Sequence, residues 1–279
     1  SKDRSIRKGA FEAWAALYES IAPKIDEIYS EVVNTRICMA KKLGFDGYTT
    51  MGYLKRRKFD YTPEQLEVFR KQVREVIVPA CVKLAERQRE RLGVEKLCFY
   101  DESVFNPDGN PTPIGDCDYM VEKAREMYHE LSPETGEFFD FMAEHELFDL
   151  VTKPGKRTGG YCRFLQSYHA PFIFANFNGT DADVSAFTHE AGHAFAYFTA
   201  SKFQKILQLC SPVNEIAEIH SMSMEFWTFP WLESFFGDKA EEYRNNHIAN
   251  AIMRIPYRIS IDEFQHRVYQ NPDMTPMER

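Results

Sequence analysis

One five-residue segment, His189-Glu190-Ala191-Gly192-His193, constrains the structure of this chain more than any other feature. Apolar residues recur at helical spacing on both sides of it and predict a helix over Asp181–Phe203. Residues four apart share one face of a helix, so both imidazoles can reach a single metal ion. Glu190 can accept a proton from a water molecule bound to that metal. Because catalytic Zn²⁺ sites keep three protein ligands and one open position, the segment predicts one Zn²⁺ per chain.

Two further features of this predicted helix concern its surroundings and its start. Gly192 lowers helix stability by about 1 kcal/mol relative to Ala, so its presence indicates that another element packs close to the helix at this point. Thr180, Asp181 and Asp183 predict a start that resembles a capping box. The alternative interpretation of the segment is an amphipathic helix whose two histidines are hydrogen-bonded and hold no metal.

A zinc site needs a third protein ligand. No histidine follows at the spacing of the longer pattern H-E-x-x-H-x-x-G-x-x-H, because Thr199 stands there. Three glutamates, Glu215, Glu218 and Glu225, lie on a helix predicted over Pro212–Phe236. Glu218 shares a helix face with Glu225, seven residues on, and with Glu215, three residues back. Spacing alone therefore leaves Glu215 and Glu218 both open as the third ligand.

The rest of the chain is mostly helical in pattern. Further helices are predicted over Ser5–Lys42, Thr62–Leu92 with its end at Gly93, Asp118–Glu130, a stretch that starts near Ser132, and Asp238–Tyr269. Two short apolar runs, Tyr161–Gln166 and Pro171–Phe177, are predicted strands. We expect a single region over 1–279, in which 1–150 form a helical wall and 151–279 the metal-binding core.

The net charge excludes some classes of binding partner, and the cysteines indicate the cellular compartment. Thirty-four Lys and Arg against forty-two Asp and Glu give a net charge of −8, the wrong sign for nucleic-acid phosphates or an anionic membrane surface. No apolar run has the length of a membrane span. The six cysteines are scattered and none form a C-x-x-C pair, which predicts reduced thiols and a cytoplasmic protein. The start at Ser1, without Met, predicts a processed or shortened segment of a longer protein.

Several stretches carry a resemblance to a known family. They are PFIFANFNGT over Pro171–Thr180, FTHEAGHA over Phe187–Ala194, EIAEIHSMSME over Glu215–Glu225, and the shorter Gly155–Cys162 and Ile261–His266. Over essentially its whole length the chain resembles the oligoendopeptidase F branch of the thimet oligopeptidase family of zinc metallopeptidases. The resemblance implies a mainly α fold, with a zincin-like metallopeptidase core and a small β-sheet beside the H-E-x-x-H helix.

The resemblance also implies roles for individual residues. It makes His189, His193 and Glu218 the zinc ligands, and Glu190 the general base that activates water. It makes Glu225 the partner that orients a ligand histidine; such outer groups fix ring orientation and raise ligand basicity.

A strand of the family's sheet is implied to bind substrate. In the family an edge strand pairs with extended peptide through its backbone, and the run Pro171–Phe177 corresponds to it. Ala175, Asn176 and Phe177 are therefore expected to contact substrate. The alternative for this run is a plain buried strand.

Members of the family are longer, and their segment that stabilises the oxyanion would lie beyond Arg279. Tyr161, Tyr168 and His169 lie near the motifs, but no sequence pattern assigns them the role of stabilising the oxyanion.

We expect a zinc metalloendopeptidase acting on short oligopeptides, with no nucleic-acid or membrane partner. The alternatives are a zinc exopeptidase on the same core, and a fragment that binds zinc and peptide with little turnover. Apolar surface left uncovered would favour a homo-oligomer.

Overall fold

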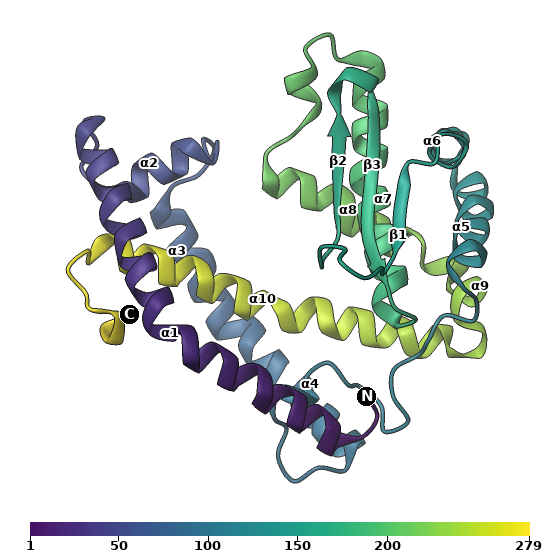
Figure 1. Cartoon of the computed structure of the whole chain (residues 1–279), viewed down its shortest axis with the longest axis horizontal. Helices are drawn as coiled ribbons and strands as arrows, with labels where there is room; N and C mark the ends of the chain where they lie inside the picture. The colour runs from purple at the N-terminus through teal and green to yellow at the C-terminus, as the bar shows by residue number, and fades with distance from the viewer. The chain divides into compact units, whose positions relative to one another are not determined.

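The computed structural model describes the backbone of residues 1–279 and every side chain apart from that of Asn214. The chain forms two compact units, one made of residues 1–109 and 247–279 and the other of residues 110–246. Helices dominate both units, and a three-stranded sheet belongs to the second (Figure 1). The predicted class, mainly α with a small sheet, is confirmed.

The elements divide between the units as follows. The first unit holds α1 (Arg4–Lys42), α2 (Tyr48–Lys55), α3 (Pro63–Gln72), α4 (Val78–Leu92) and most of α10 (Ala240–Gln270), which begins in the second unit. The second unit holds α5 (Cys117–Leu131), α6 (Pro133–Glu144), β1 (Phe148–Val151), β2 (Tyr161–Leu165), β3 (Ala170–Phe177), α7 (Asp181–Phe203), α8 (Asn214–Trp227) and α9 (Leu232–Phe236).

The first unit has a small core and a polar anchor. Val33 of α1 packs against Val268 and Tyr269 of α10, and all three are buried. At the start of α1, the arginines Arg4 and Arg7 both donate to the carboxylate of Asp101, each with a nitrogen to oxygen distance of 2.9 Å. Burial alone would raise the pKa of Asp101, but these hydrogen bonds outweigh it and lower the pKa to about 2.

The helix predicted over Thr62–Leu92 is interrupted by one turn of π-helix. Thr62 caps α3 in a capping box with Gln65, and Gly93 ends α4 with a φ of 65°, a conformation that suits glycine. The π-turn at Val73–Ile77 was not predicted, because one inserted residue changes the apolar spacing very little. The short helix α2 was missed as well, since eight residues carry too few apolar positions to show a period.

The sheet lies in the order β1-β3-β2. β3 pairs in parallel with β1 and antiparallel with β2, where Cys162 lies opposite Ile173. The prediction that Pro171–Phe177 forms an edge strand is therefore wrong, because β3 is the middle strand and has neighbours on both sides. The error comes from β1, whose four residues are too few to give a strand pattern in the sequence.

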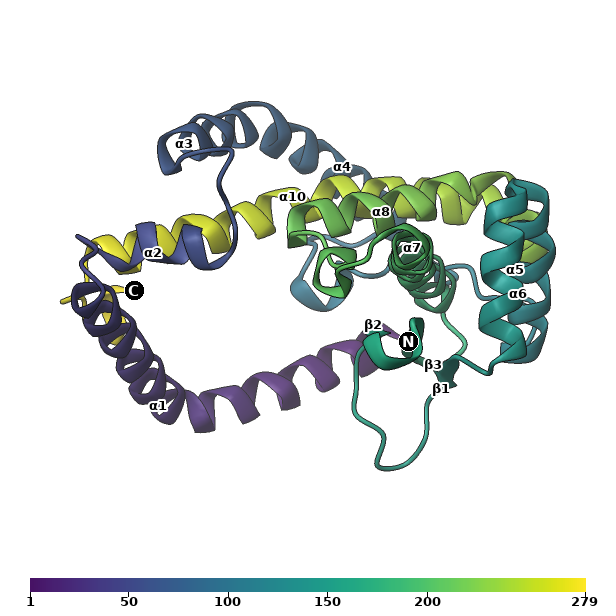
Figure 2. The same cartoon turned by 90° about the horizontal axis from the view of Figure 1, so that it is seen from above.

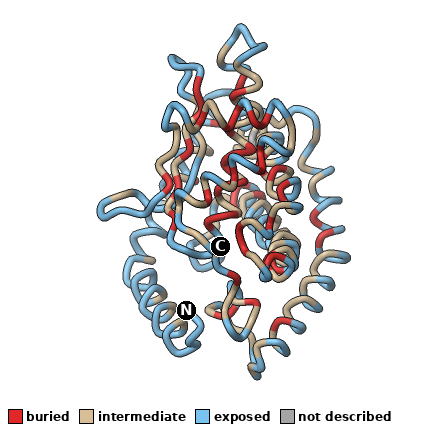
Figure 3. Tube along the Cα trace, turned by 90° about the vertical axis from the view of Figure 1, so that its right-hand side faces the viewer, coloured by how far each residue is buried: buried red, intermediate tan, exposed pale blue. Residues whose placement is uncertain are grey.

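The core of the second unit packs α5, α6 and α7 against the sheet. Phe138 and Phe139 of α6 are fully buried, and Phe187 of α7 contacts Phe139, Phe148 and Phe177 at ring separations of 5.7 to 6.0 Å. Figure 3 colours the Cα trace by burial, with buried residues in red. Fully burying such side chains contributes roughly 1.5–3 kcal/mol each, so the apolar face of α7 is held firmly on the sheet.

Helix α7 spans the predicted Asp181–Phe203, but its start is built differently from the prediction. The Thr180 hydroxyl donates to Asn178 Oδ1 and does not cap the helix. Instead the buried carboxylate of Asp183 accepts the backbone N–H groups of Asn178 and Gly179, at 3.0 and 2.7 Å. The acidic residue thus ties the end of the preceding loop to the first turn of α7.

The helix predicted over Pro212–Phe236 is broken after Trp227. A 3₁₀ turn at Phe229–Trp231, which contains Pro230, separates α8 from α9. Proline disfavours continuation of a helix because it lacks an N–H and its ring clashes with the preceding turn, and here the helix breaks. Nowhere in the described part of the chain is there a helix both long enough and apolar enough to cross a membrane.

Candidate metal centre

Helices α7 and α8 touch backbone to backbone at Gly192. A Cβ at this position would lie 2.6 Å from Ser221 Cα, 2.7 Å from the His220 carbonyl oxygen and 2.9 Å from Met224 Cβ. Only glycine permits this approach, which confirms the prediction that another element packs close here. Figure 2, which views α7 nearly end on, shows α8 directly beside it. The side chains around Gly192 on α7 therefore face α8 across a very short distance.

Three metal-ligating side chains converge beside this contact. His189 Nε2 lies 3.3 Å from Glu218 Oε2, and His193 Nε2 lies 3.9 Å from Glu218 Oε1. One donor atom from each residue lies within 4.8 Å of the others, and this is the only such group of three among the residues whose side chains are described. Two donors about 2.1 Å from a tetrahedral Zn²⁺ lie roughly 3.4 Å apart, so the group fits a zinc ion with little adjustment.

The geometry separates the two glutamates that spacing left open. Glu218 belongs to the group of three, whereas Glu215, one turn earlier on α8, does not and is exposed. The arrangement agrees with the assignment that the family resemblance implies for Glu218.

Glu225 holds one of the two histidines. Its Oε1 lies 2.6 Å from His189 Nδ1, so the ring donates Nδ1–H to the carboxylate and leaves the Nε2 lone pair toward Glu218 and His193. Burial alone would lower the pKa of His189, but the neighbouring carboxylates, Glu225 foremost, outweigh it and raise the pKa. Burial lowers the pKa of His193, which keeps that ring in the neutral form that binds metal.

Glu190 lies on the sheet side of α7, against the start of β2. It is buried, with 8% of its surface exposed, and its Oε2 has no hydrogen-bond partner among the described atoms. Burial raises the pKa of Glu190, while a hydrogen bond from the backbone N–H of Cys162 opposes the rise. A Cβ on Gly160, the residue before β2, would lie 3.7 Å from Glu190 Oε1, so the carboxylate lies next to the segment that leads into β2. Sequence reasoning missed this neighbour; the paired glycines at 159–160 were the available signal.

The three residues expected to contact substrate are buried or hydrogen-bonded within the chain. Ala175 and Phe177 of β3 are buried, with 1% and 7% of their surface exposed. The Asn176 amide donates to the carbonyl oxygens of Arg157 and Gly159, at 2.9 and 2.8 Å. These hydrogen bonds join the loop that precedes β2 to the C-terminal end of β3. Because β3 has a neighbour on each side, these residues offer no free strand edge, and their contact with substrate stays a prediction. The strand with an open edge beside Glu190 is β2.

The other aromatic and imidazole candidates are spread along the β2–β3 hairpin. Tyr161 opens β2 and stacks on Phe174 of β3, with ring centroids 4.9 Å apart. Tyr168 and His169 form the turn between the two strands, where Tyr168 is 79% exposed and His169 has a positive φ of 50°. None of the three belongs to the metal-ligating group found among the described residues.

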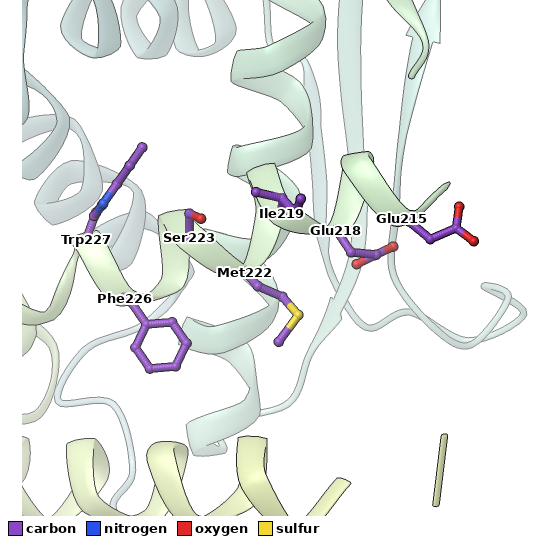
Figure 4. Close-up of a pocket in the computed structure, with 7 residues that line it drawn as sticks. All are labelled: Glu215, Glu218, Ile219, Met222, Ser223, Phe226 and Trp227. Atoms are coloured by element: carbon purple, nitrogen blue, oxygen red, sulfur yellow. The ribbon is translucent and has the colours of Figure 1, made fainter. Parts of the chain in front are cut away.

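A pocket of about 470 Å³ follows α8 away from Glu218 (Figure 4). It is lined by both acidic and apolar side chains of that helix: Glu215, Glu218, Ile219, Met222, Ser223, Phe226 and Trp227. Its acidic end is shared with the metal centre through Glu218, and the remainder is mainly apolar. The pocket thus places apolar surface directly next to the ligand group.

Comparison with known proteins gives a family match over nearly the whole chain. The model of peptidase family M3 matches residues 1–110 and 116–279. A curated relative, an oligoendopeptidase F homolog of Mycoplasma pneumoniae, is 25% identical over 249 residues, which cover 81% of this chain and 36% of that protein.

Solved structures agree with this match. The structure of PZ peptidase A with inhibitor 2 has a TM-score of 0.96 at 50% identity, and a protein from Bacillus anthracis str. Ames described as an oligoendopeptidase F has 0.94 at 47%. They cover 100% and 99% of this chain, which in turn spans 49% and 51% of theirs. A peptidase structure from Chlamydophila abortus, at 17% identity and a TM-score of 0.68, shares the fold. The chain thus spans about half the length of the solved relatives.

Proposed function

Because the chain belongs to peptidase family M3, we propose that it carries the zinc centre of a metalloendopeptidase that hydrolyses internal bonds of short oligopeptides. The observation that carries the proposal is the convergence of His189, His193 and Glu218 beside the buried carboxylate of Glu190. Two imidazoles and one carboxylate are a donor set that suits catalytic Zn²⁺ and leaves a position open for water or substrate.

The ligands and their partner form one unit in this proposal. His189, His193 and Glu218 hold the ion, and Glu225 fixes the ring of His189 through the 2.6 Å hydrogen bond. When bound, Zn²⁺ lowers the pKa of a water molecule and polarises the scissile carbonyl group.

Glu190 is the general base. Its carboxylate takes a proton from the attacking water and passes it to the nitrogen that leaves as the peptide bond breaks. Burial raises the pKa of Glu190, which brings its basicity closer to the value that proton transfer near neutral pH requires. The hydrogen bond from the backbone N–H of Cys162 in β2 limits where the carboxylate can point.

The open edge of β2 binds the peptide backbone. β2 has β3 on one side only, and its first residues border Glu190. A peptide added to this edge would present its carbonyl groups along the strand by main-chain hydrogen bonds, which would give affinity for peptides of varied sequence. The contact predicted for Ala175, Asn176 and Phe177 stays a separate prediction.

Metal content is the first test of the proposal. We expect one Zn²⁺ per chain after dialysis, measured by mass spectrometry, and none bound stoichiometrically by the variants His189→Ala and His193→Ala. His145→Ala is a matched control, because His145 also precedes a glutamate but is exposed and lies outside the ligand group. Full zinc occupancy in the double variant of His189 and His193 would overturn the assignment.

Cleavage of an internally quenched peptide is the second test. Glu190→Gln should keep zinc and the fold while hydrolysis falls by roughly 10²–10⁴-fold, because general base catalysis typically contributes that much. The wild-type rate in this variant would rule out Glu190 as the base. Cleavage confined to terminal residues of longer peptides would instead favour the exopeptidase alternative.

A further inference from the structure

We propose that Ser221 is a positioning residue that fixes the carboxylate of Glu218 for metal binding. The inference rests on the proposed zinc centre and adds a residue to it. Ser221 lies on α8, one helical turn after Glu218, and none of its surface is exposed.

The hydroxyl of Ser221 has two acceptors, and both belong to Glu218. Its Oγ lies 3.1 Å from the carboxylate Oε2 and 3.2 Å from the backbone carbonyl oxygen. A hydroxyl has a single proton, and a hydrogen bond to an ionised carboxylate is roughly twice as strong as one to a neutral acceptor. The proton is therefore placed mainly on Oε2.

Ser221 is itself fixed by the contact between the helices. Its Cα is the atom nearest to the space a Cβ on Gly192 would occupy, so its backbone is pressed directly against α7 between His189 and His193. The side chain of Glu218, by contrast, is 46% exposed and could rotate toward solvent. Glu218 is the most exposed of the three proposed ligands. The hydrogen bond from Ser221, whose own position is fixed by the helix contact, therefore restricts the rotation of the Glu218 side chain.

The hydrogen bond also distinguishes the two oxygens of the ligand. Oε2 is engaged by Ser221 and faces His189, whereas Oε1 faces His193 and has no contact with the hydroxyl. The hydrogen bond therefore makes the two oxygens unequal as donors to a metal ion. Loss of the hydroxyl should therefore change the geometry at the metal as well as the affinity.

The test replaces Ser221 in the 279-residue chain and measures metal binding directly. For Ser221→Ala we expect Zn²⁺ affinity to fall by about 10–100-fold, the usual effect of removing a group that orients a ligand, when measured by competition with a chromophoric chelator. The visible absorption bands of the Co²⁺-loaded variant should also shift, since they report coordination geometry. Ser221→Thr retains the hydroxyl and should restore both readouts.

Thr188→Val is the matched control. The Thr188 hydroxyl is also buried in a helix, but it donates only to the backbone carbonyl oxygens of Val184 and Ser185. We expect its Zn²⁺ affinity and Co²⁺ spectrum to equal those of the wild type. Circular dichroism of the metal-free variants checks that each is folded.

The outcomes separate this inference from the proposed function. Absence of stoichiometric zinc from the wild-type chain would overturn the zinc centre and the role of Ser221 together. Wild-type affinity and spectrum in Ser221→Ala, with zinc bound normally, would overturn the role of Ser221 alone. Equal losses in Ser221→Ala and Ser221→Thr would also overturn it, because they would point to packing and not to the hydroxyl.

Discussion

Replacing Gly192 with Ala tests whether the contact between α7 and α8 builds the metal centre. Non-bonded carbon atoms are normally about 3.5–4.0 Å apart, so a Cβ only 2.6 Å from Ser221 Cα overlaps by roughly 1 Å. The three nearest atoms are a Cα, a carbonyl oxygen and a Cβ, and none of them can rotate away. The two helices must therefore move apart or tilt.

The expected loss of stability follows from two opposing effects. Overpacking of a buried contact costs typically about 1–3 kcal/mol, and we expect the upper end because the backbone itself is obstructed. Alanine in place of glycine returns about 1 kcal/mol of helix propensity. The free energy of unfolding should fall by about 2 kcal/mol. A displacement of about 1 Å between the histidines and Glu218 should also weaken zinc binding.

The assay is urea denaturation of the metal-free protein, followed by circular dichroism, together with a zinc titration. Gly9→Ala is the matched control, because Gly9 also lies in a helix and nothing lies within 4 Å of its would-be Cβ. That variant should stabilise its own unit by about 0.5–1 kcal/mol. A Gly192→Ala chain as stable as the wild type, with unchanged zinc affinity, would refute the reasoning.

Three further predictions concern single carboxylates. Glu218→Gln should abolish tight zinc binding while Glu215→Gln leaves it near wild type, as measured by equilibrium dialysis; the reverse result would shift the third ligand by one helical turn. Glu225→Gln should weaken zinc binding by about 10–100-fold, because the hydrogen bond to His189 loses its charge, and an unchanged affinity would contradict this. Asp101→Asn should destabilise the first unit by about 2 kcal/mol at pH 7, because it removes charge-assisted hydrogen bonds from two arginines. Since the pKa of Asp101 is lowered to about 2 on folding, the wild type should lose this advantage as pH falls from about 4 to 2; a difference independent of pH in urea denaturation would contradict it.

Features that depend on local spacing could be read from the residues alone. The helix over Asp181–Phe203, the shared face of His189 and His193, and the close contact at Gly192 all follow from the helical repeat and from the conformational cost of glycine. The family resemblance added Glu218 and Glu225, which spacing alone had left among several candidates. The structure brings both to the histidines.

Features that depend on distant contacts were decided only by the tertiary structure. The middle position of β3 depends on β1, a four-residue strand that pairs in parallel with a segment more than twenty residues later. The neighbours of Glu190 come from the start of β2, and the buried hydroxyl of Ser221 reaches Glu218 within the helix that crosses α7 at Gly192. Periodicity reports which face of an element is apolar, but it does not report which element covers that face. The backbone groups beside the proposed base and the burial of Ser221 beside the proposed ligand depend on that second kind of information, because they lie where separate elements meet.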